Sequence, residues 1–299
     1  MRVKTVPIVY NQGTGYRTAI MQPSFLLDTS AFKALSASRL EAASQSASLC
    51  VSPFCFWELL EHLEDNNKFH RVKGNLMKFR HVVVLDDPHA EVCRLVLPLS
   101  DNVHSRVRDG DLVNAALAAL ADSNSTEEFY QRYIRDESGQ VRQIAGCVSA
   151  VRETLQVREN GFKTLLRAIA SEVRAGKVRV VEVSDYDRGV EELSRGWWLQ
   201  IGDKVNGSSE VYGQFVRKTY RYHFYLLHRA REYAERNTTA IDPEPNDFED
   251  ARLCLQAGLA DFTGVVTNDE ALNRCLRASG VPSQSPLQVW NTTTFPPSA

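Results

Sequence analysis

The chain has 299 residues, of which 43% are hydrophobic and 24% are charged, a composition typical of a globular protein with a buried core. This length allows one large domain or two domains of ordinary size. The 35 Lys and Arg residues nearly balance the 37 Asp and Glu residues. A general positive charge therefore cannot hold the chain on nucleic acid, and binding to a polyanion would need a local basic patch.

The sequence also predicts a cellular compartment. No apolar run approaches the length of a transmembrane helix, and the first 22 residues lack the apolar core of a signal peptide. The six cysteines are scattered and form no C-x-x-C pair, which argues against structural zinc and favours reduced thiols. We therefore expect a cytoplasmic protein without a membrane partner.

The N-terminal part of the chain alternates between strands and helices. A short apolar run ends at Asp28, and Ser30 is placed to cap the following helix. The predicted strands are 25–28, 48–52 and 81–85, and the predicted helices are 31–48 and 54–66. Short, wholly apolar strands separated by helices indicate an α/β fold with a mostly parallel central sheet.

The middle of the chain has mainly helical spacing, and the α/β alternation then resumes. Helices are predicted at 112–120, 141–175, 189–199 and 211–236, with one strand at 177–183. After the breaker Asp242-Pro-Glu-Pro245 we expect a helix at 246–258, a strand at 262–267, a helix at 268–278 and a strand at 286–290. The predicted organisation is a core formed by 1–97 and 241–299, interrupted by a largely helical insertion at 98–240.

Four carboxylates occupy comparable positions in this pattern. Asp28 follows the first strand, Glu58 lies in the helix after the second, and Asp250 and Asp269 flank the late strand. The carboxyl ends of parallel strands meet at one edge of a sheet, so these side chains are expected to converge there. Clustered carboxylates repel each other, and Mg²⁺ or Mn²⁺ would remove that conflict. The alternative for each acid is an ordinary helix cap.

The sequence around these acids resembles the PIN-domain ribonucleases. The segments that carry the resemblance are Leu-Leu-Asp28-Thr-Ser, Ser-Pro-Phe-Cys-Phe-Trp-Glu58, Asp250-Ala-Arg-Leu and Thr267-Asn-Asp269, in this order. The resemblance covers residues 23–90 and 244–292, and it implies a PIN-like α/β/α sandwich. The insertion at 98–240 departs from the compact form of many members of that family.

The resemblance also implies a function, namely metal-dependent hydrolysis of RNA by an endoribonuclease. Asp28, Glu58, Asp250 and Asp269 would be the catalytic residues and would hold Mg²⁺ or Mn²⁺. Three further residues are candidates for supporting roles. Ser30 and Thr267 could orient water or a ligand, or could cap helices. Asp247 could replace or assist Asp250 as a metal ligand.

Charge is unevenly distributed along the second half of the chain. Residues 212–236 contain six basic and two acidic residues, and 237–270 contain eight acids with Arg252 as the single base. Aromatic residues are interleaved with Arg217, Lys218 and Arg221, a combination that suits single-stranded RNA. The alternative is an amphipathic helix whose aromatic side chains belong to the core.

Two other interpretations remain open. A PIN-like fold without catalysis could serve as an RNA-binding or protein-interaction scaffold, and the insertion could bind a protein partner or a second copy of the chain. A different metal-dependent phosphohydrolase, or a DNA nuclease, would use the same residue types.

Overall fold

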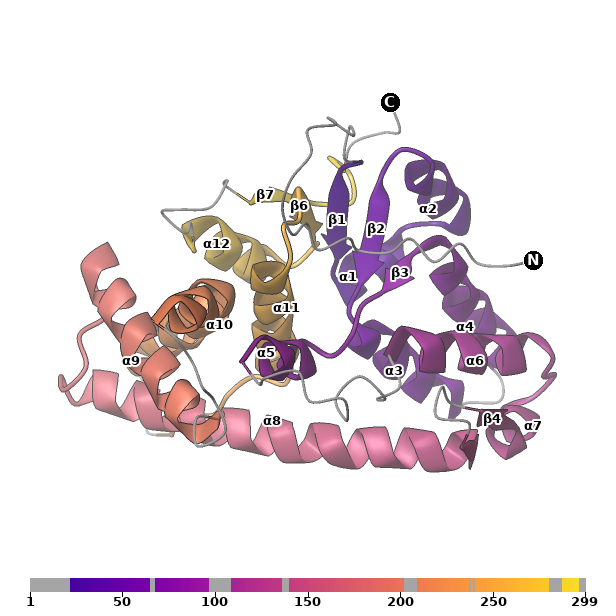
Figure 1. The fold of residues 1–299 in the computed structure, drawn as a ribbon, viewed down its shortest axis with the longest axis horizontal. Helices are drawn as coiled ribbons and strands as arrows, with labels where there is room; N and C mark the ends of the chain where they lie inside the picture. The colour runs from indigo at the N-terminus through magenta and orange to yellow at the C-terminus, as the bar shows by residue number, and fades with distance from the viewer. Residues whose placement is uncertain are drawn as a thin grey trace.

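We describe the protein from a computed structural model (Figure 1). The structure describes residues 22–64, 68–96, 109–135, 140–201, 209–236, 238, 240–279 and 287–295.

A five-stranded parallel sheet forms the centre of the molecule. Its strands are β1 (Ser24–Leu27), β2 (Ser48–Val51), β3 (Val83–Val84), β6 (Gly264–Val266) and β7 (Gln288–Trp290). Their order in the sheet is β3-β2-β1-β6-β7, and each neighbouring pair is parallel. The predicted α/β fold with a parallel sheet is therefore confirmed, although several strands are shorter than predicted.

The strand order creates a switch point between β1 and β6. The chain moves outward from β1 to β2 and β3, returns to β6 on the other side of β1, and continues outward to β7. In open α/β sheets, connections that leave in opposite directions open a crevice at the carboxyl ends of the two central strands. Asp28 follows β1 directly and Thr267 follows β6 directly, so both lie at this crevice.

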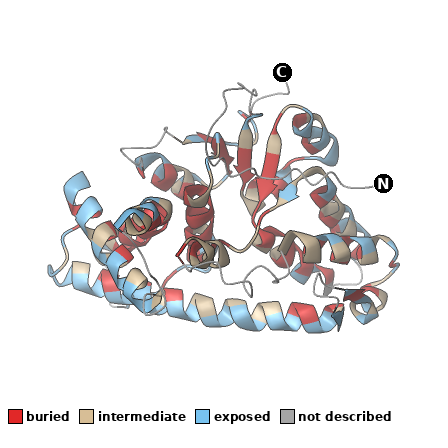
Figure 2. Cartoon of the chain, viewed as in Figure 1, coloured by how far each residue is buried: buried red, intermediate tan, exposed pale blue. Residues whose placement is uncertain are grey.

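The two faces of the sheet belong to two hydrophobic clusters. Successive side chains of a strand point to opposite faces. Leu26 and Val265 accordingly pack in one cluster, whereas Leu27 and Val266 pack in the other. The central strands are coloured as buried in Figure 2. Hydrophobic clusters cover both faces of the sheet, which explains why its strands appear in the sequence as short runs of apolar residues.

One cluster is built largely from the N-terminal half of the chain. Its helices are α1 (Thr29–Ala34), α2 (Ala37–Ser44), α3 (Pro53–Glu61), α4 (Phe69–Leu76), α6 (Asp109–Ala121) and α7 (Thr126–Gln131), with short 3-10 turns at His62–Glu64 and Met77–His81.

The predicted helix at 31–48 is wrong in one respect, because it is two helices. Leu35 and Ser36 have extended backbone angles, and the Ser36 hydroxyl accepts a hydrogen bond from the Arg39 N–H at the start of α2. The predicted cap is also wrong. Ser30 lies inside α1, and Asp28 holds the N-cap position.

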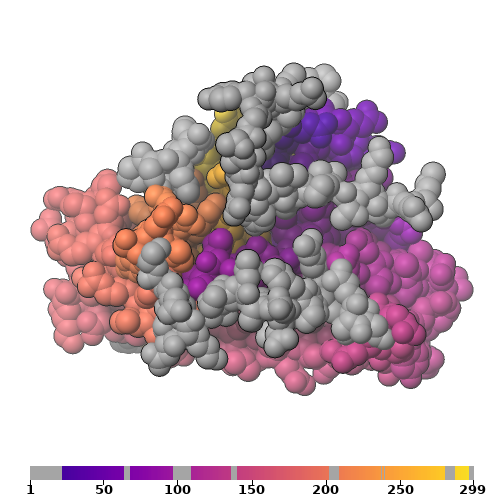
Figure 3. Space-filling model, viewed as in Figure 1, coloured from indigo at the N-terminus to yellow at the C-terminus, as the bar shows by residue number. Residues whose placement is uncertain are grey.

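The other cluster is formed mainly by later helices. They are α5 (Pro88–Val96), α9 (Val183–Ile201), α10 (Ser209–Glu235), α11 (Asp247–Leu259) and α12 (Glu270–Ala278). Helix α10 packs against α8, α9 and α11. The space-filling view places α9 and α10 at one end of the molecule and α6 and α7 at the other (Figure 3).

Helix α8 (Ile144–Arg174) belongs to both clusters. Its 31 residues run along the whole lower side of the molecule in Figure 1. Ile144 and Val148 pack in the cluster of the N-terminal half, and Leu166 and Ala170 pack in the other. The described parts of residues 98–240 therefore contribute to both clusters.

Two predictions within this middle segment are wrong. Residues 177–183 are not a strand, because the chain turns at Gly176, which has a φ of 71°, and the Asp185 carboxylate accepts the N–H groups of Val181 and Glu182. An antiparallel hairpin of β4 (Tyr133–Arg135) and β5 (Val141–Gln143) was not predicted, and it takes the first three residues of the helix predicted at 141–175.

Across the described ranges, no helix combines the length and the apolar character that a membrane span requires.

A close approach between α10 and α11 gives a test of this packing. A Cβ atom on Gly258 would lie 2.3 Å from the Lys218 carbonyl oxygen, whereas a Cβ on Gly213 would meet no atom within 4 Å among the described residues. We expect Gly258→Ala to lower the free energy of unfolding by about 1–3 kcal/mol, because the two helices must separate. Gly213→Ala should raise it by about 0.5–1 kcal/mol, since alanine favours a helix. Urea denaturation of both variants measures the difference, and equal effects would contradict the described packing.

Candidate active site

Asp28 lies at the centre of the crevice. Its Oδ2 accepts hydrogen bonds from the Ser30 hydroxyl at 2.5 Å and from the Thr267 hydroxyl at 3.0 Å. Burial raises the pKa of the Asp28 carboxyl, these hydrogen bonds oppose the rise, and the charge of Glu58 adds to it. The carboxylate thus joins the end of β1 to the end of β6.

The turn after β6 positions Asp269. Thr267 is 1% exposed, and its hydroxyl oxygen accepts the Asp269 N–H at 3.0 Å. Oδ1 of Asp269 accepts the Leu272 N–H at 2.8 Å and caps α12. The Asn268 N–H donates to the Ser30 hydroxyl at 3.2 Å. Capping is therefore one role of Asp269, and the Ser30 and Thr267 hydroxyls hold Asp28 and this turn together.

Asp250 approaches the crevice from α11. Burial, followed by the charges of Asp28 and Asp269, raises the pKa of Asp250 to about 8. The Tyr225 hydroxyl lies 3.2 Å from Asp250 Oδ2 and 3.1 Å from Asp247 Oδ1. A tyrosine hydroxyl has a single proton, so it can donate to one of these carboxylates at a time.

Asp247 is placed behind Asp250 as a structural group. Its Oδ1 accepts the Arg229 Nε–H at 2.7 Å, and its Oδ2 accepts the Tyr233 hydroxyl at 2.6 Å and the Glu244 N–H at 2.8 Å. The residue is 1% exposed. Both oxygens already have partners, and the Tyr225 hydroxyl lies between Asp247 and Asp250.

Glu58 reaches the same region from α3 and is paired with a base. Its Oε1 lies 2.7 Å from the Nζ of Lys33, and both side chains are 37% exposed. The charge of Glu58 contributes to the raised pKa of Asp28, so the two carboxylates interact. Lys33 is a site residue that the sequence analysis missed. Its position in the helix after β1 is visible in the sequence, but its pairing with Glu58 depends on how α1 and α3 pack.

The four predicted acids therefore form one electrostatic group. Asp28 interacts with Glu58 and Asp250, and Asp250 interacts with Asp269. Oxygen donors of this kind suit Mg²⁺ or Mn²⁺. Burial raises the pKa of Asp250 most, and the neighbouring negative charges that add to the rise are charges that a cation would offset. Within the ranges that the structure describes, no group of three or more His, Cys, Asp or Glu side chains is arranged to hold a metal ion.

The predicted RNA-binding residues on α10 are not gathered on one surface. Arg217 is exposed, whereas Lys218 donates to the Leu259 carbonyl at 2.9 Å. Arg221 is 2% exposed and donates to the Ser279 carbonyl at 3.0 Å, which corrects its assignment as an RNA contact. The interleaved aromatic side chains are buried as well; these are Tyr220, Tyr222, Phe224 and Tyr225. Helix α10 is thus a core helix, the alternative considered above.

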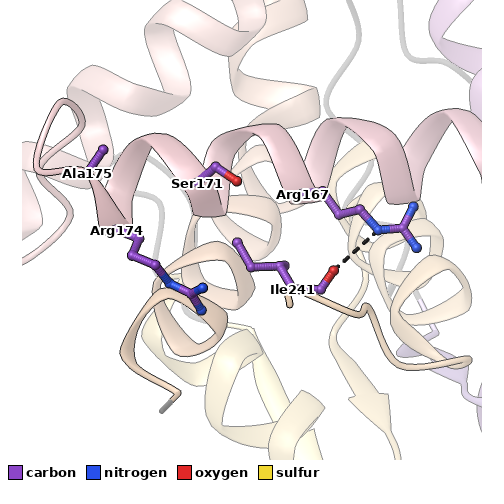
Figure 4. Close-up of a pocket in the computed structure, with 5 residues that line it drawn as sticks. All are labelled: Arg167, Ser171, Arg174, Ala175 and Ile241. Carbon is purple, nitrogen blue, oxygen red and sulfur yellow. Dashed lines mark hydrogen bonds between the residues drawn. The ribbon is translucent and has the colours of Figure 1, made fainter. Parts of the chain in front are cut away.

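A hollow of about 390 Å³ lies elsewhere, beside the C-terminal half of α8. Arg167, Ser171 and Arg174 line it from the helix, and Ile241 lines it from the segment before α11 (Figure 4). The Arg167 Nε–H donates to the Ile241 carbonyl at 3.3 Å. None of the candidate site residues is among the described residues that line this hollow, so it is separate from the carboxylate group.

Comparison with known proteins adds no family assignment. No family model matches the chain, and no curated protein or solved structure shows significant similarity to it.

The raised pKa of Asp250 predicts a pH dependence of stability. A carboxyl whose pKa rises from 3.8 to about 8 on folding binds its proton more tightly in the folded chain. Its ionisation therefore destabilises the fold, and this contribution to stability is lost as the pH rises from about 4 to about 8. We expect the free energy of unfolding to fall less between pH 5 and pH 8 in Asp250→Asn than in the unsubstituted chain.

Urea denaturation at several pH values measures this difference. Asp261→Asn, at an exposed acid in the turn before β6, is the matched control and should leave the pH dependence unchanged. The same pH dependence in Asp250→Asn and in the unsubstituted chain would show that burial and neighbouring charge do not raise the pKa of Asp250.

Proposed function

We propose that this protein is a metal-dependent endoribonuclease of the PIN type. The single observation that carries the proposal is the position of Asp28 at the switch point of the sheet, where one hydroxyl, that of Thr267, donates to Asp28 Oδ2 and accepts the Asp269 N–H. Burial and the charges of Asp28 and Asp269 also raise the pKa of Asp250. The likeness of the surrounding segments to PIN-domain ribonucleases and the parallel sheet agree with this function.

Each residue has a distinct part in the proposed site. Asp28, Glu58, Asp250 and Asp269 would hold Mg²⁺ or Mn²⁺, and such an ion supplies an activated water and neutralises charge on the leaving oxygen. The Ser30 and Thr267 hydroxyls fix the orientation of Asp28 by donating to its Oδ2. Tyr225 is a positioning residue, because its hydroxyl bridges Asp250 and the buried Asp247.

One observation favours a second candidate function. The 2.7 Å ion pair between Lys33 and Glu58 already neutralises one of the four acids. If this ion pair persists, fewer carboxylate charges are left to bind a cation. The protein would then be an RNA-binding or protein-interaction scaffold that does not cleave RNA. Cleavage, rather than binding, therefore distinguishes the two candidates.

The test is incubation of the purified chain with end-labelled single-stranded RNA and Mn²⁺, analysed on a denaturing gel. We expect internal cleavage that a chelator abolishes. Asp28→Asn and Asp269→Asn should each lower the cleavage rate by more than about 100-fold, because each removes a charged oxygen donor.

Asp261→Asn again serves as the matched control and should cleave at the normal rate. Labelled single-stranded DNA in a parallel reaction separates a ribonuclease from a general nuclease. Cleavage that survives both the chelator and the Asp28→Asn substitution would refute the metal mechanism, and binding without any cleavage would establish the scaffold.

A further inference from the structure

A second hollow lies beside the candidate site. It has a volume of about 640 Å³ and is lined by residues of α1, of α3 and the turn after it, and of α4 together with the residue that precedes it. This volume is within the range of typical ligand sites. Leu59 and Val72 give the hollow an apolar part, and Asn75 and His62 add polar groups.

Bases outnumber acids among the described residues that line this hollow. The bases are Lys33, Lys68 and Arg71, of which Lys33 is paired with Glu58, and Glu61 is the one acid among the described lining residues. The Glu61 Oε1 itself lies 3.7 Å from the Nε of Arg152, a further base. The hollow is therefore a local basic patch on a chain whose total charge is close to neutral.

The sequence around the hollow has the same character. Residues 68–81 contain five Lys and Arg residues and no Asp or Glu. Two of these bases form hydrogen bonds within the protein. Lys73 donates to the Ala121 carbonyl at 2.8 Å, and Lys78 donates to the Lys33 carbonyl at 3.1 Å. Arg71 and Arg80 are exposed. This run is more uniformly basic than the α10 segment, and it leaves arginine side chains on the surface.

One lining residue connects the hollow to the carboxylate group. The Lys33 Nζ lies 2.7 Å from Glu58 Oε1, so the hollow adjoins the proposed site. A strand of nucleic acid bound by Lys68 and Arg71 would therefore pass close to Glu58. Basic side chains pair with phosphates, and apolar surfaces contact bases, which is how proteins hold a single strand.

We propose that the hollow between α3 and α4 binds the backbone of single-stranded RNA and leads it to Glu58. The direction of the strand toward a cleavage site rests on the proposed function, but the binding itself does not. The basic lining residues are complementary in charge to the phosphates of RNA. The contact between Lys33 and Glu58 places the hollow next to the proposed site.

The test measures binding without catalysis. Fluorescence anisotropy of a labelled 15-nucleotide oligouridylate is followed with the full chain in EDTA, at NaCl concentrations from 50 to 200 mM. We expect Lys68→Ala combined with Arg71→Ala to weaken binding by about 10-fold and to reduce the salt slope by about 1.4, since each phosphate contact on a single strand contributes about 0.7.

A matched double variant controls for the loss of charge. Arg39→Ala combined with Arg188→Ala removes two exposed bases from α2 and α9, and it should bind as the unsubstituted chain does. Circular dichroism checks that both variants are folded. A weaker affinity in the control pair, with normal affinity in the Lys68 and Arg71 pair, would place the RNA away from the hollow and overturn the proposal.

Competition identifies the ligand. Displacement of the RNA by a polyglutamate peptide at equal concentration would indicate an acidic protein partner, and displacement by 10 mM inorganic phosphate would indicate a simple anion site; either result overturns the proposal. Absence of RNA binding by the unsubstituted chain overturns it too.

Cleavage assays with Mn²⁺ on the same proteins separate this proposal from the proposed function. Binding that depends on Lys68 and Arg71, without any cleavage, would support the hollow and refute the nuclease. Cleavage with an unchanged KM in that double variant would support the nuclease and refute the hollow.

Discussion

The hydrogen bonds of the Asp28 carboxylate hold together the two strand ends on which the candidate site depends. A partly buried carboxylate loses hydration, and the donors that compensate it are hydroxyls from both sides of the switch point, Ser30 and Thr267. The Asp28 N–H also donates to the Val266 carbonyl at 2.9 Å, which continues the ladder between β1 and β6. Asp28 is therefore both a candidate catalytic residue and a residue whose hydrogen bonds join β1 to β6.

Buried basic residues explain why the charged composition of α10 does not correspond to a basic surface there. Arg229 donates to Asp247 and Glu244, and Arg221 donates to the carbonyl of Ser279. These guanidinium groups satisfy helix ends and carboxylates within the fold, as buried charges must. Helix α10 consequently has a charged sequence and a core position. Its basic residues connect α10 to α11 and to the end of α12.

The elements with strong local signals were predictable from the sequence, whereas those set by tertiary packing were not. The apolar runs around Leu26 and Val265 predicted buried parallel strands, and the acids after them predicted the crevice. The strands β4 and β5 have only three residues each, and the break at Ser36 carries no glycine or proline, so neither feature has a strong signal in the sequence. Within the site, the positions of Asp28 and Asp269 follow from strand ends.

Other site partners follow only from the packing of helices. Tyr225 reaches Asp250 because α10 lies against α11, and Lys33 reaches Glu58 because α1 lies beside α3. No spacing in the sequence encodes either contact, since the partners in each pair are 25 positions apart on different helices.

The pairing of β1 with β6 has a consequence for how the chain matures. Asp28 and Thr267 are 239 positions apart, and the intervening residues must be synthesised before β1 acquires its second neighbour. Contacts this distant in sequence form slowly, because the loop that they close is long. Until then, one edge of β1 presents unpaired N–H and C=O groups, the kind of edge through which chains aggregate. A ribosome that stalls before residue 264 would therefore release a chain with an open sheet edge and without the β6 half of the candidate site.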